Sequence, residues 1–180
     1  MDVQSAIENR KTVFRFSEKD VSEETVVNLI GSAVKAPAAG GIREYEFIAV
    51  TDKDTKAQLS KLSSTPNIDS APFMIVLVCD KSKIDAVFDE EESGVFCVEN
   101  AALAIENILL TATSYGLGSA WVATLQQESI KKLLNIPGKY AVRGVIAIGY
   151  PEKEEAIGKI SSPLDMSKIV HIEKFNNNAE

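Results

Sequence analysis

The chain has 180 residues, 45% of them hydrophobic and 25% charged, and its formal net charge is -7. These proportions are typical of one ordinary globular domain that is long enough to bury a core. Because the sequence is acidic and has no stripe of lysine and arginine to neutralise phosphates, it argues against nucleic acid as a partner.

Membrane and export segments are not apparent in the sequence. No apolar stretch free of polar residues reaches the roughly 20 residues that a membrane helix needs. The first residues, MDVQSAIENRKTV, contain no apolar signal core. Cys79 and Cys97 form no CxxC pattern, and so few cysteines indicate a reducing compartment. We therefore expect a cytoplasmic protein.

The hydrophobic pattern predicts a single domain, residues 1–180, in which helices and strands alternate. Helices are expected over Asp2–Glu8, Ser22–Val34, Asp52–Leu62 and Gln126–Leu134, and strands over Tyr45–Val50, Phe73–Cys79 and Val142–Tyr150. Ser22 suits an N-cap, and Pro37 ends the helix that Ser22 opens. The continuous apolar run Phe73–Cys79 is typical of a strand buried on both faces. Asp89–Glu92 is expected to be an acidic loop.

The run Val98–Trp121 is the most informative segment, because its apolar residues follow helical spacing and cover nearly the whole circumference. Such a helix should be buried in a core or against a second subunit. Gly116 fits the left-handed position that follows a helix end.

The C-terminal tail is unusual, because Lys168–Phe175 alternates like a strand after a polar stretch. The tail, residues 163–180, could pack on its own domain or on a partner subunit. Together with the all-round apolar helix, it favours the partner.

Few side chains suggest catalysis. His171 is the single histidine, and a lone histidine beside Ile172 is more often structural than catalytic. Without a second histidine or a cysteine pair, neither a zinc site nor a Ser-His-Asp triad is supported, and no catalytic side chain is assigned. Cys79 ends a buried strand and is interpreted as an inert core thiol. Any chemistry would then come from a bound cofactor.

Several segments form an ordered series that spans nearly the whole chain. Arg10-Lys11-Thr12-Val13-Phe14-Arg15-Phe16 matches Arg-Arg/His-Ser-x-x-x-Phe, and Ala36-Pro37-Ala38-Ala39-Gly40-Gly41-Ile42-Arg43-Glu44-Tyr45-Glu46-Phe47 matches Ala-Pro-Ser-x-x-Asn-x-Gln-Pro-Trp-x-Phe. Ala71-Pro72, the long helix, Gly116-Leu117-Gly118-Ser119 and Ile148-Gly149-Tyr150-Pro151 complete the series. In order and spacing it resembles the FMN-dependent nitroreductase family.

The resemblance implies an α+β fold, with a central mixed sheet flanked by helices, in an intertwined homodimer. The long helix would be central to the interface, and the C-terminal tail would be swapped onto the other subunit. Each of the two FMN molecules would lie in a pocket made by both chains. The implied activity is transfer of hydride from NAD(P)H through FMN to a small-molecule acceptor such as a nitroaromatic, a quinone or an unsaturated metabolite.

Residues are carried over from the family motifs one by one. Arg10, Lys11 and Thr12 would clamp the FMN phosphate, although Arg10 and Lys11 also suit the carboxyl end of the first helix. The second motif places Pro37, Ala38, Ala39, Gly40 and Arg43 at the flavin, where a guanidinium would stabilise the anionic reduced ring. Backbone groups of Val122, Ala123 and Thr124 would approach the ring, with an amide of Ala123 or Thr124 donating to its central nitrogen.

Two further positions are assigned in the same way. Asn67 matches a position that contacts the pyrimidine edge, although an Asn in a polar loop is more often a turn residue. Lys159 is the nearest cation to Ser161-Ser162, where relatives carry a phosphate-binding Arg.

The sequence also departs from the family motif. Ala38 and Gly41 replace its Ser and Asn, and Arg43-Glu44-Tyr45 replaces its Gln-Pro-Trp. These losses leave two alternatives open. One is a different flavin chemistry, such as reductive dehalogenation or flavin breakdown. The other is a degenerate member that binds FMN weakly or not at all and acts as a binding or structural dimer.

Overall fold

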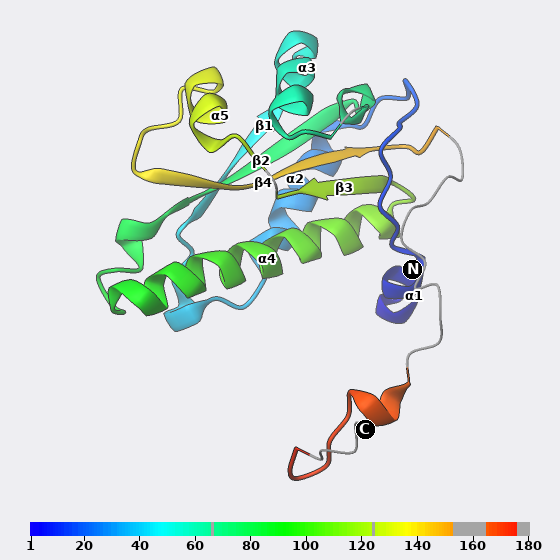
Figure 1. Cartoon of the computed structure of the whole chain (residues 1–180). Coiled ribbons are helices and arrows are strands. Elements are labelled where there is room, and N and C mark those ends of the chain that lie inside the picture. Colours follow the sequence, from blue (N-terminus) through cyan, green and yellow to red (C-terminus); the bar gives the residue numbers. More distant parts are fainter. Residues whose placement is uncertain (66, 124, 153–164, 176–180) are drawn as a thin grey trace.

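The computed structural model describes residues 1–65, 67–123, 125–152 and 165–175. It is an α+β fold in which one sheet lies between two layers of helices (Figure 1). The α-helices are α1 (Val3–Asn9), α2 (Glu23–Ala33), α3 (Lys53–Leu62), α4 (Glu90–Ser114) and α5 (Gln127–Leu133). The strands are β1 (Tyr45–Val50), β2 (Phe73–Asp80), β3 (Gly118–Val122) and β4 (Tyr140–Gly149). Short 3-10 turns are η1 (Ala39–Gly41), η2 (Ile68–Ser70), η3 (Lys81–Lys83) and η4 (Met166–Lys168).

The sheet has the strand order β1-β2-β4-β3, and every neighbouring pair is antiparallel. The expectation of a mixed sheet is therefore wrong for the strands that the structure describes. The parallel pairing in this part of the chain is an isolated bridge between Thr12 and Ser119 at the edge of β3. It does not extend into a strand, because the segment continues past the sheet to a bridge between Phe16 and Pro151.

The buried strand β2 confirms the reading of its continuous apolar run. All eight of its residues are buried. Alternate side chains enter two cores: Phe73, Ile75 and Leu77 pack with residues of α2 and α4, whereas Met74 and Val76 pack with residues of α3 and α5. Figure 1 shows this arrangement, with α4 and α2 on one face of the sheet and α3 and α5 on the other.

Helix α4 begins earlier than the apolar run suggested. The Asp89 carboxylate accepts a hydrogen bond from the amide of Glu92 at 2.9 Å, and three glutamates occupy the first turn. The expected acidic loop is therefore the N-cap and first turn of the helix, where negative charge is favourable. The predicted end is confirmed: Gly116 has φ 72°, and the amides of Gly116 and Leu117 donate to Thr113 and Ala112, both at 2.9 Å.

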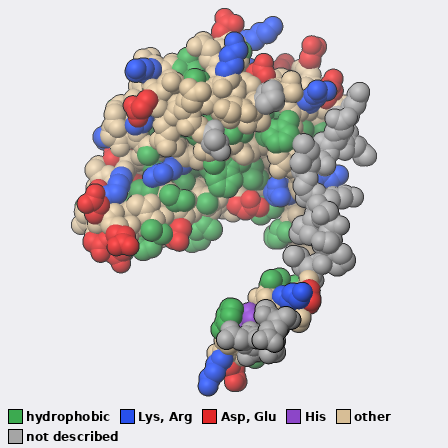
Figure 2. Space-filling model, in the orientation of Figure 1, with side chains coloured by type: hydrophobic (Ala, Val, Ile, Leu, Met, Phe, Trp, Pro, Cys, Tyr) green, Lys and Arg blue, Asp and Glu red, His purple; other side chains and the backbone are tan. Residues whose placement is uncertain are grey.

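One face of α4 packs in the core and another lies open in the single chain. Val95, Val98 and Leu103 are 50%, 52% and 44% exposed. Figure 2 shows hydrophobic side chains gathered over this helix. Within one chain α4 is therefore buried on one side, and its other apolar side could be buried only against a second subunit, the second of the two expected alternatives. Among the described residues α4 is also the helix that is long and apolar enough to cross a membrane, a test that the core helix of a soluble protein passes as well.

Two other expectations need correction. Gly118–Val122 is the strand β3, which the sequence analysis does not predict; its five residues are too few for the alternation of side chains to be recognised beside a long helix. The tail predicted as a strand contains the turn η4 and has no strand within residues 165–175. Its apolar side chains Ile169, Val170, Ile172 and Phe175 are exposed, because this segment lies apart from the two helical layers (Figure 1).

Candidate functional site

The segment after α1 forms one part of the candidate site. Arg10 is the C-cap of α1, and its amide donates to Ala6 at 2.9 Å. Thr12 bridges to Ser119 of β3, where the amide of Val13 donates to the Ser119 carbonyl at 3.0 Å. The segment that carries Arg10, Lys11 and the Thr12 hydroxyl is therefore held beside the first residues of β3. All three residues are partly buried.

Arg10 faces an acidic partner on α4. Its Nε lies 3.8 Å from Oε1 of Glu106, a long separation for an ion pair. Burial raises the pKa of Glu106, and the nearby Arg10 opposes that rise. At this separation Arg10 makes no hydrogen bond with Glu106, so the N–H groups of the guanidinium can still donate to another anion.

Ser119 adds a polar group that the sequence did not reveal. Its residue is 2% exposed, and its hydroxyl has no hydrogen-bond partner among the residues that the structure describes. A buried hydroxyl without a partner is costly, so a ligand or water is expected to satisfy it. Its place in the Gly-Leu-Gly-Ser motif was the available signal.

Asn67 lies close to the same part of the chain. It has φ 71°, in the left-handed region, and its carbonyl accepts from the hydroxyl of Ser70 at 2.7 Å. That hydroxyl in turn accepts from the amide of Phe16 at 3.0 Å. The Asn67 loop is therefore tied to the segment that follows Thr12. Its backbone also fits the alternative reading as a turn residue.

The second predicted segment lies elsewhere. Pro37, Ala38, Ala39 and Gly40 lead into and through η1, which contacts α4 near its first half (Figure 1). The amide of Ala39 donates to Oδ1 of Asn100 at 3.0 Å. Nε of Arg43 donates to the carbonyl of Val34 at 2.7 Å, so this guanidinium is fixed at the end of α2.

Val122 ends β3 and is buried, and Ala123 follows it in an exposed position. Val122 lies three residues after Ser119 on this edge strand, and Ala123 comes directly after the strand ends. Thr124 and Lys159 lie outside the described residues.

The structure thus divides the predicted site residues into two groups. In the first group, the segment Arg10–Thr12 lies beside β3, the strand that Val122 ends. Asn67 is tied to the continuation of this segment through Ser70 and Phe16. The loop from Pro37 to Arg43 packs instead against α2 and the first half of α4. Among the described residues no hydrogen bond or ion pair joins the two groups.

Comparison with known proteins identifies the fold and the family. The sequence model of the nitroreductase family matches residues 60–150. The chain belongs to the nitroreductase family. A relative from Methanothermobacter thermautotrophicus, provisionally named NADH dehydrogenase/NAD(P)H nitroreductase, is 28% identical over 97% of this chain and 88% of its own length. An NADPH-dependent oxidoreductase of Staphylococcus haemolyticus is 24% identical over 99% of this chain and 76% of its own length.

Solved structures agree. An FMN-dependent nitroreductase from Clostridium difficile superposes with a TM-score of 0.79 at 29% identity, over 94% of this chain and 98% of that one. NfrA2 from B. megaterium has a TM-score of 0.86 at 24% identity, over 99% of this chain and 77% of that one. At this identity the similarity supports the fold alone. The resemblance expected from the sequence is confirmed, and the protein is an oxidoreductase enzyme of this family.

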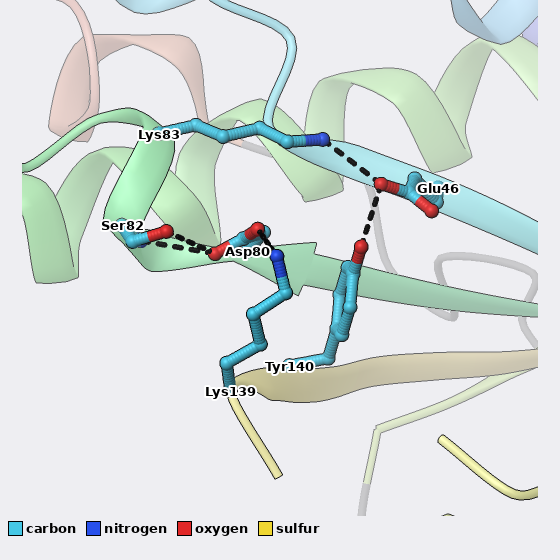
Figure 3. A network of polar contacts seen from close by, with 6 residues as sticks. All are labelled: Glu46, Asp80, Ser82, Lys83, Lys139 and Tyr140. Atoms are coloured by element: carbon cyan, nitrogen blue, oxygen red, sulfur yellow. Dashed lines mark hydrogen bonds and ion pairs between the residues drawn. The ribbon is translucent and has the colours of Figure 1, made fainter. Parts of the chain in front are cut away.

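A network of charged and polar side chains lies at the end of β2 that adjoins Glu44, and it shares no residue with either group of predicted site residues (Figure 3). Glu46 accepts from Lys83 at 2.9 Å and from the Tyr140 hydroxyl at 2.8 Å. Asp80 accepts from Lys139 at 2.6 Å and from the Ser82 hydroxyl at 2.6 Å. These donors lower the pKa of both carboxyl groups, Lys83 having the largest effect on Glu46 and Lys139 on Asp80. With their acids ionised and paired, they suit a structural role.

Both thiols are buried, which confirms the interpretation of Cys79 as a core thiol. Burial, followed by the charge of Glu44, raises the pKa of Cys79 to about 12, and the same causes raise that of Cys97. Neither thiol is a nucleophile at neutral pH. In the part of the chain that the structure describes, no three His, Cys, Asp or Glu side chains come together to hold a metal.

Proposed function

We propose that the protein is a cytoplasmic, homodimeric FMN oxidoreductase that takes hydride from NAD(P)H and reduces a small-molecule acceptor. The separation of the predicted site residues into two groups carries this proposal. Each group is held by its own hydrogen bonds, so neither would move to meet the other within one chain. A second chain would bring the missing group, and the exposed apolar face of α4 offers a surface for it.

The first group has the chemistry that a phosphate needs. Arg10 and Lys11 supply positive charge on an acidic protein, and the hydroxyls of Thr12 and Ser119 supply neutral donors. The unpartnered Ser119 hydroxyl is the observation that favours a ligand here over a mere helix end.

The second group has a different character. Ala38, Ala39, Gly40 and Gly41 have no polar side chain, so this loop would contact a flavin ring through its backbone and small apolar surface. Gly40 and Gly41 have φ 58° and 73°, which permits the close turn. Bound FMN would supply the redox chemistry by accepting hydride and passing electrons on. An amide at Ala123 or Thr124 would orient it, and α4 would exclude water.

The names of relatives support the remaining parts of the proposal. NAD(P)H and NADPH appear in the names of the two relatives described above, and FMN in that of one solved structure. We infer the same donor and cofactor for this chain, with a nitroaromatic, a quinone or an unsaturated metabolite as the acceptor.

The decisive experiment is the visible absorption spectrum of the purified protein after addition of FMN and gel filtration. We expect retained flavin at about one per chain, in a particle of twice the 19.5 kDa chain mass, and oxidation of NADH or NADPH. Protein that retains no flavin would contradict the proposal and favour the non-enzymatic dimer. Retained flavin without NAD(P)H turnover would favour a different flavin chemistry.

A variant with a matched control locates the phosphate. Arg10→Ala should weaken FMN binding about tenfold or more, since a charge-assisted pair contributes roughly 1.5–3 kcal/mol. Lys132→Ala removes the same charge from the exposed surface of α5 and should leave the FMN dissociation constant unchanged. Equal effects of the two variants would show that Arg10 acts only through overall charge.

A further inference from the structure

Glu44 is a carboxylate with no exposed surface, and it stands where the family motif has Pro. It immediately precedes β1, and its own carbonyl accepts from the amide of Asp80 at 2.8 Å. Both carboxylate oxygens accept from Nδ2 of Asn100, at 3.3 and 3.1 Å. Burying an ionisable side chain is costly unless hydrogen bonds compensate. An apolar residue at this position would have a lower desolvation cost, so the pairing of Glu44 with Asn100 needs a further explanation.

The other end of the Asn100 amide supplies that explanation. Asn100 lies on α4 and is 2% exposed, and its Oδ1 accepts the amide of Ala39 at 3.0 Å. The amide group can donate only through Nδ2 and accept only through Oδ1. Glu44 therefore fixes which way the Asn100 side chain points, and Asn100 thereby holds the amide of Ala39.

The loop is a 3-10 turn in which the amides of Gly41 and Ile42 donate to the carbonyls of Ala38 and Ala39 at 2.9 and 3.0 Å, and the hydrogen bond from Ala39 to Asn100 ties this turn to α4. Residues 38–41 are Ala-Ala-Gly-Gly, with two residues at positive φ and no polar side chain. Its contacts include the Ala39 amide on Asn100 and the ring of Phe88, which lies 3.2 Å from where a Cβ on Gly40 would be. A glycine-rich loop without an anchor loses much conformational entropy on binding a ligand.

We propose that Asn100 and Glu44 are positioning residues that hold the loop 38–41 ready to bind flavin. This inference rests on the proposed function. The protein has lost the Ser and Asn side chains of the family motif, and a buried pair beneath the loop fixes its backbone instead. Neither residue touches the ligand in this arrangement: Asn100 acts through Ala39, and Glu44 acts through Asn100.

Exchanging the carboxylate of Glu44 with the side-chain amide of Asn100 tests whether the two residues act as a pair. Asn100→Asp sets two carboxylates against each other and removes the donor, whereas adding Glu44→Gln restores one donor and one carboxylate in reversed order. In the double variant the new amide donates to the new carboxylate on α4, whose second oxygen accepts from the amide of Ala39. Asn107→Asp is the matched control, because Asn107 lies one heptad along α4 and its Nδ2 donates to Ser32 at 3.1 Å.

Two readouts separate positioning from general stability. Hydrogen exchange of the Ala39 amide in the flavin-free protein should accelerate about tenfold or more in Asn100→Asp, because repulsion from Glu44 turns the new carboxylate away and the Ala39 amide loses its buried acceptor. The FMN dissociation constant should rise by about the same factor, and the double variant should recover both to within about threefold. The control should change neither. Should the single variant not fold, Glu44→Gln with Asn100→Ala removes the charge and the acceptor together and should show the same two losses.

Three results would overturn the inference. The first is an Ala39 amide that exchanges no faster in Asn100→Asp than in the wild type, relative to the core amide of Val76. The second is an unchanged FMN dissociation constant in Asn100→Asp. The third is a double variant that regains neither slow exchange nor FMN affinity. Wild-type protein that binds no FMN would instead overturn the proposed function and the flavin half of the inference with it. In that case, slow exchange of Ala39 in the wild type and fast exchange in the variant would still establish the anchor.

Discussion

At the scale of single residues, the side chain of Trp121 on β3 lies close to Gly144 on the neighbouring strand β4. The indole of Trp121 covers Gly144, and a Cβ on Gly144 would lie 2.5 Å from its Nε1 and 3.2 Å from Cδ1 of Ile105. Trp121 is the only tryptophan of the sequence and is 38% exposed. The glycine therefore sets where this half-open ring lies beside α4.

Gly144→Ala should displace the ring. The added methyl group overpacks the contact, so we expect a loss of about 1–3 kcal/mol in the free energy of unfolding. Tryptophan emission should shift in the folded protein, because the ring moves relative to solvent. Gly138→Ala is the control, since a Cβ there meets no atom within 4 Å. Unchanged emission in Gly144→Ala would mean that the ring does not depend on this glycine.

At the scale of elements, the network of Glu46 and Asp80 joins β1, β2 and β4 at one end of the sheet (Figure 3). Because the pKa of each carboxyl group is lowered by folding, its contribution to stability is present above the ordinary carboxyl pKa and is lost as pH falls through the lowered value. The pKa values of Lys83 and Lys139 are raised, so their contribution is lost only in strongly alkaline solution.

Lys139→Met should lower the melting temperature at pH 7 by about 2–4 °C, the change typical of a small loss in a chain of this size. The difference from wild type should shrink as the solution is acidified below about pH 4, where free carboxyl groups protonate. Thermal unfolding across pH measures this. Lys131→Met, which breaks a pair with the exposed carboxylate of Glu128, should show no such dependence of the difference on pH. A pH-independent difference would contradict the assignment.

The same scale shows how much of the fold could be predicted from sequence. The bounds of β1 were predicted correctly, and those of β2 to within one residue, because alternating or continuous apolar runs between polar loops have few other interpretations. The start of α4 was missed because glutamates in a first turn look like an exposed loop until the Asp89 cap is known. Strand β3 was missed because five residues after a helix give too short a pattern.

At the candidate site, sequence motifs found the segments but not the contacts between them. Arg10, Lys11 and Thr12 were predicted from a motif, and the structure places Thr12 on β3. Nothing in the sequence pairs Glu44 with Asn100, since 56 residues separate them and the exposed side of a helix was the simpler place for an Asn. Long-range polar pairs of this kind depend on tertiary packing, which local patterns do not encode.

At the scale of the whole molecule, the proposed homodimer depends on the exposed face of α4. Val98→Glu places a charge in the middle of this face. In the proposed homodimer the charge would be buried, so the variant should elute as a 19.5 kDa monomer and lose FMN together with its second chain. Gel filtration with light scattering measures both. Val27→Glu on the exposed side of α2 is the matched control and should elute as the wild type does. A variant that keeps the wild-type mass would contradict an interface at this face.

The docking of the N-terminal segment on β3 and β4 has a consequence for the order of synthesis. The bridge from Thr12 to Ser119 and that from Phe16 to Pro151 can form only after Ser119 and Pro151 have been synthesised. The residues made first therefore reach their final positions only after most of the chain has been translated. At about 5–20 residues per second, that delay lasts roughly 7–30 seconds on the ribosome. During that time the Arg10 segment has no surface to dock on, and cofactor capture would have to follow release of nearly the whole chain from the exit tunnel.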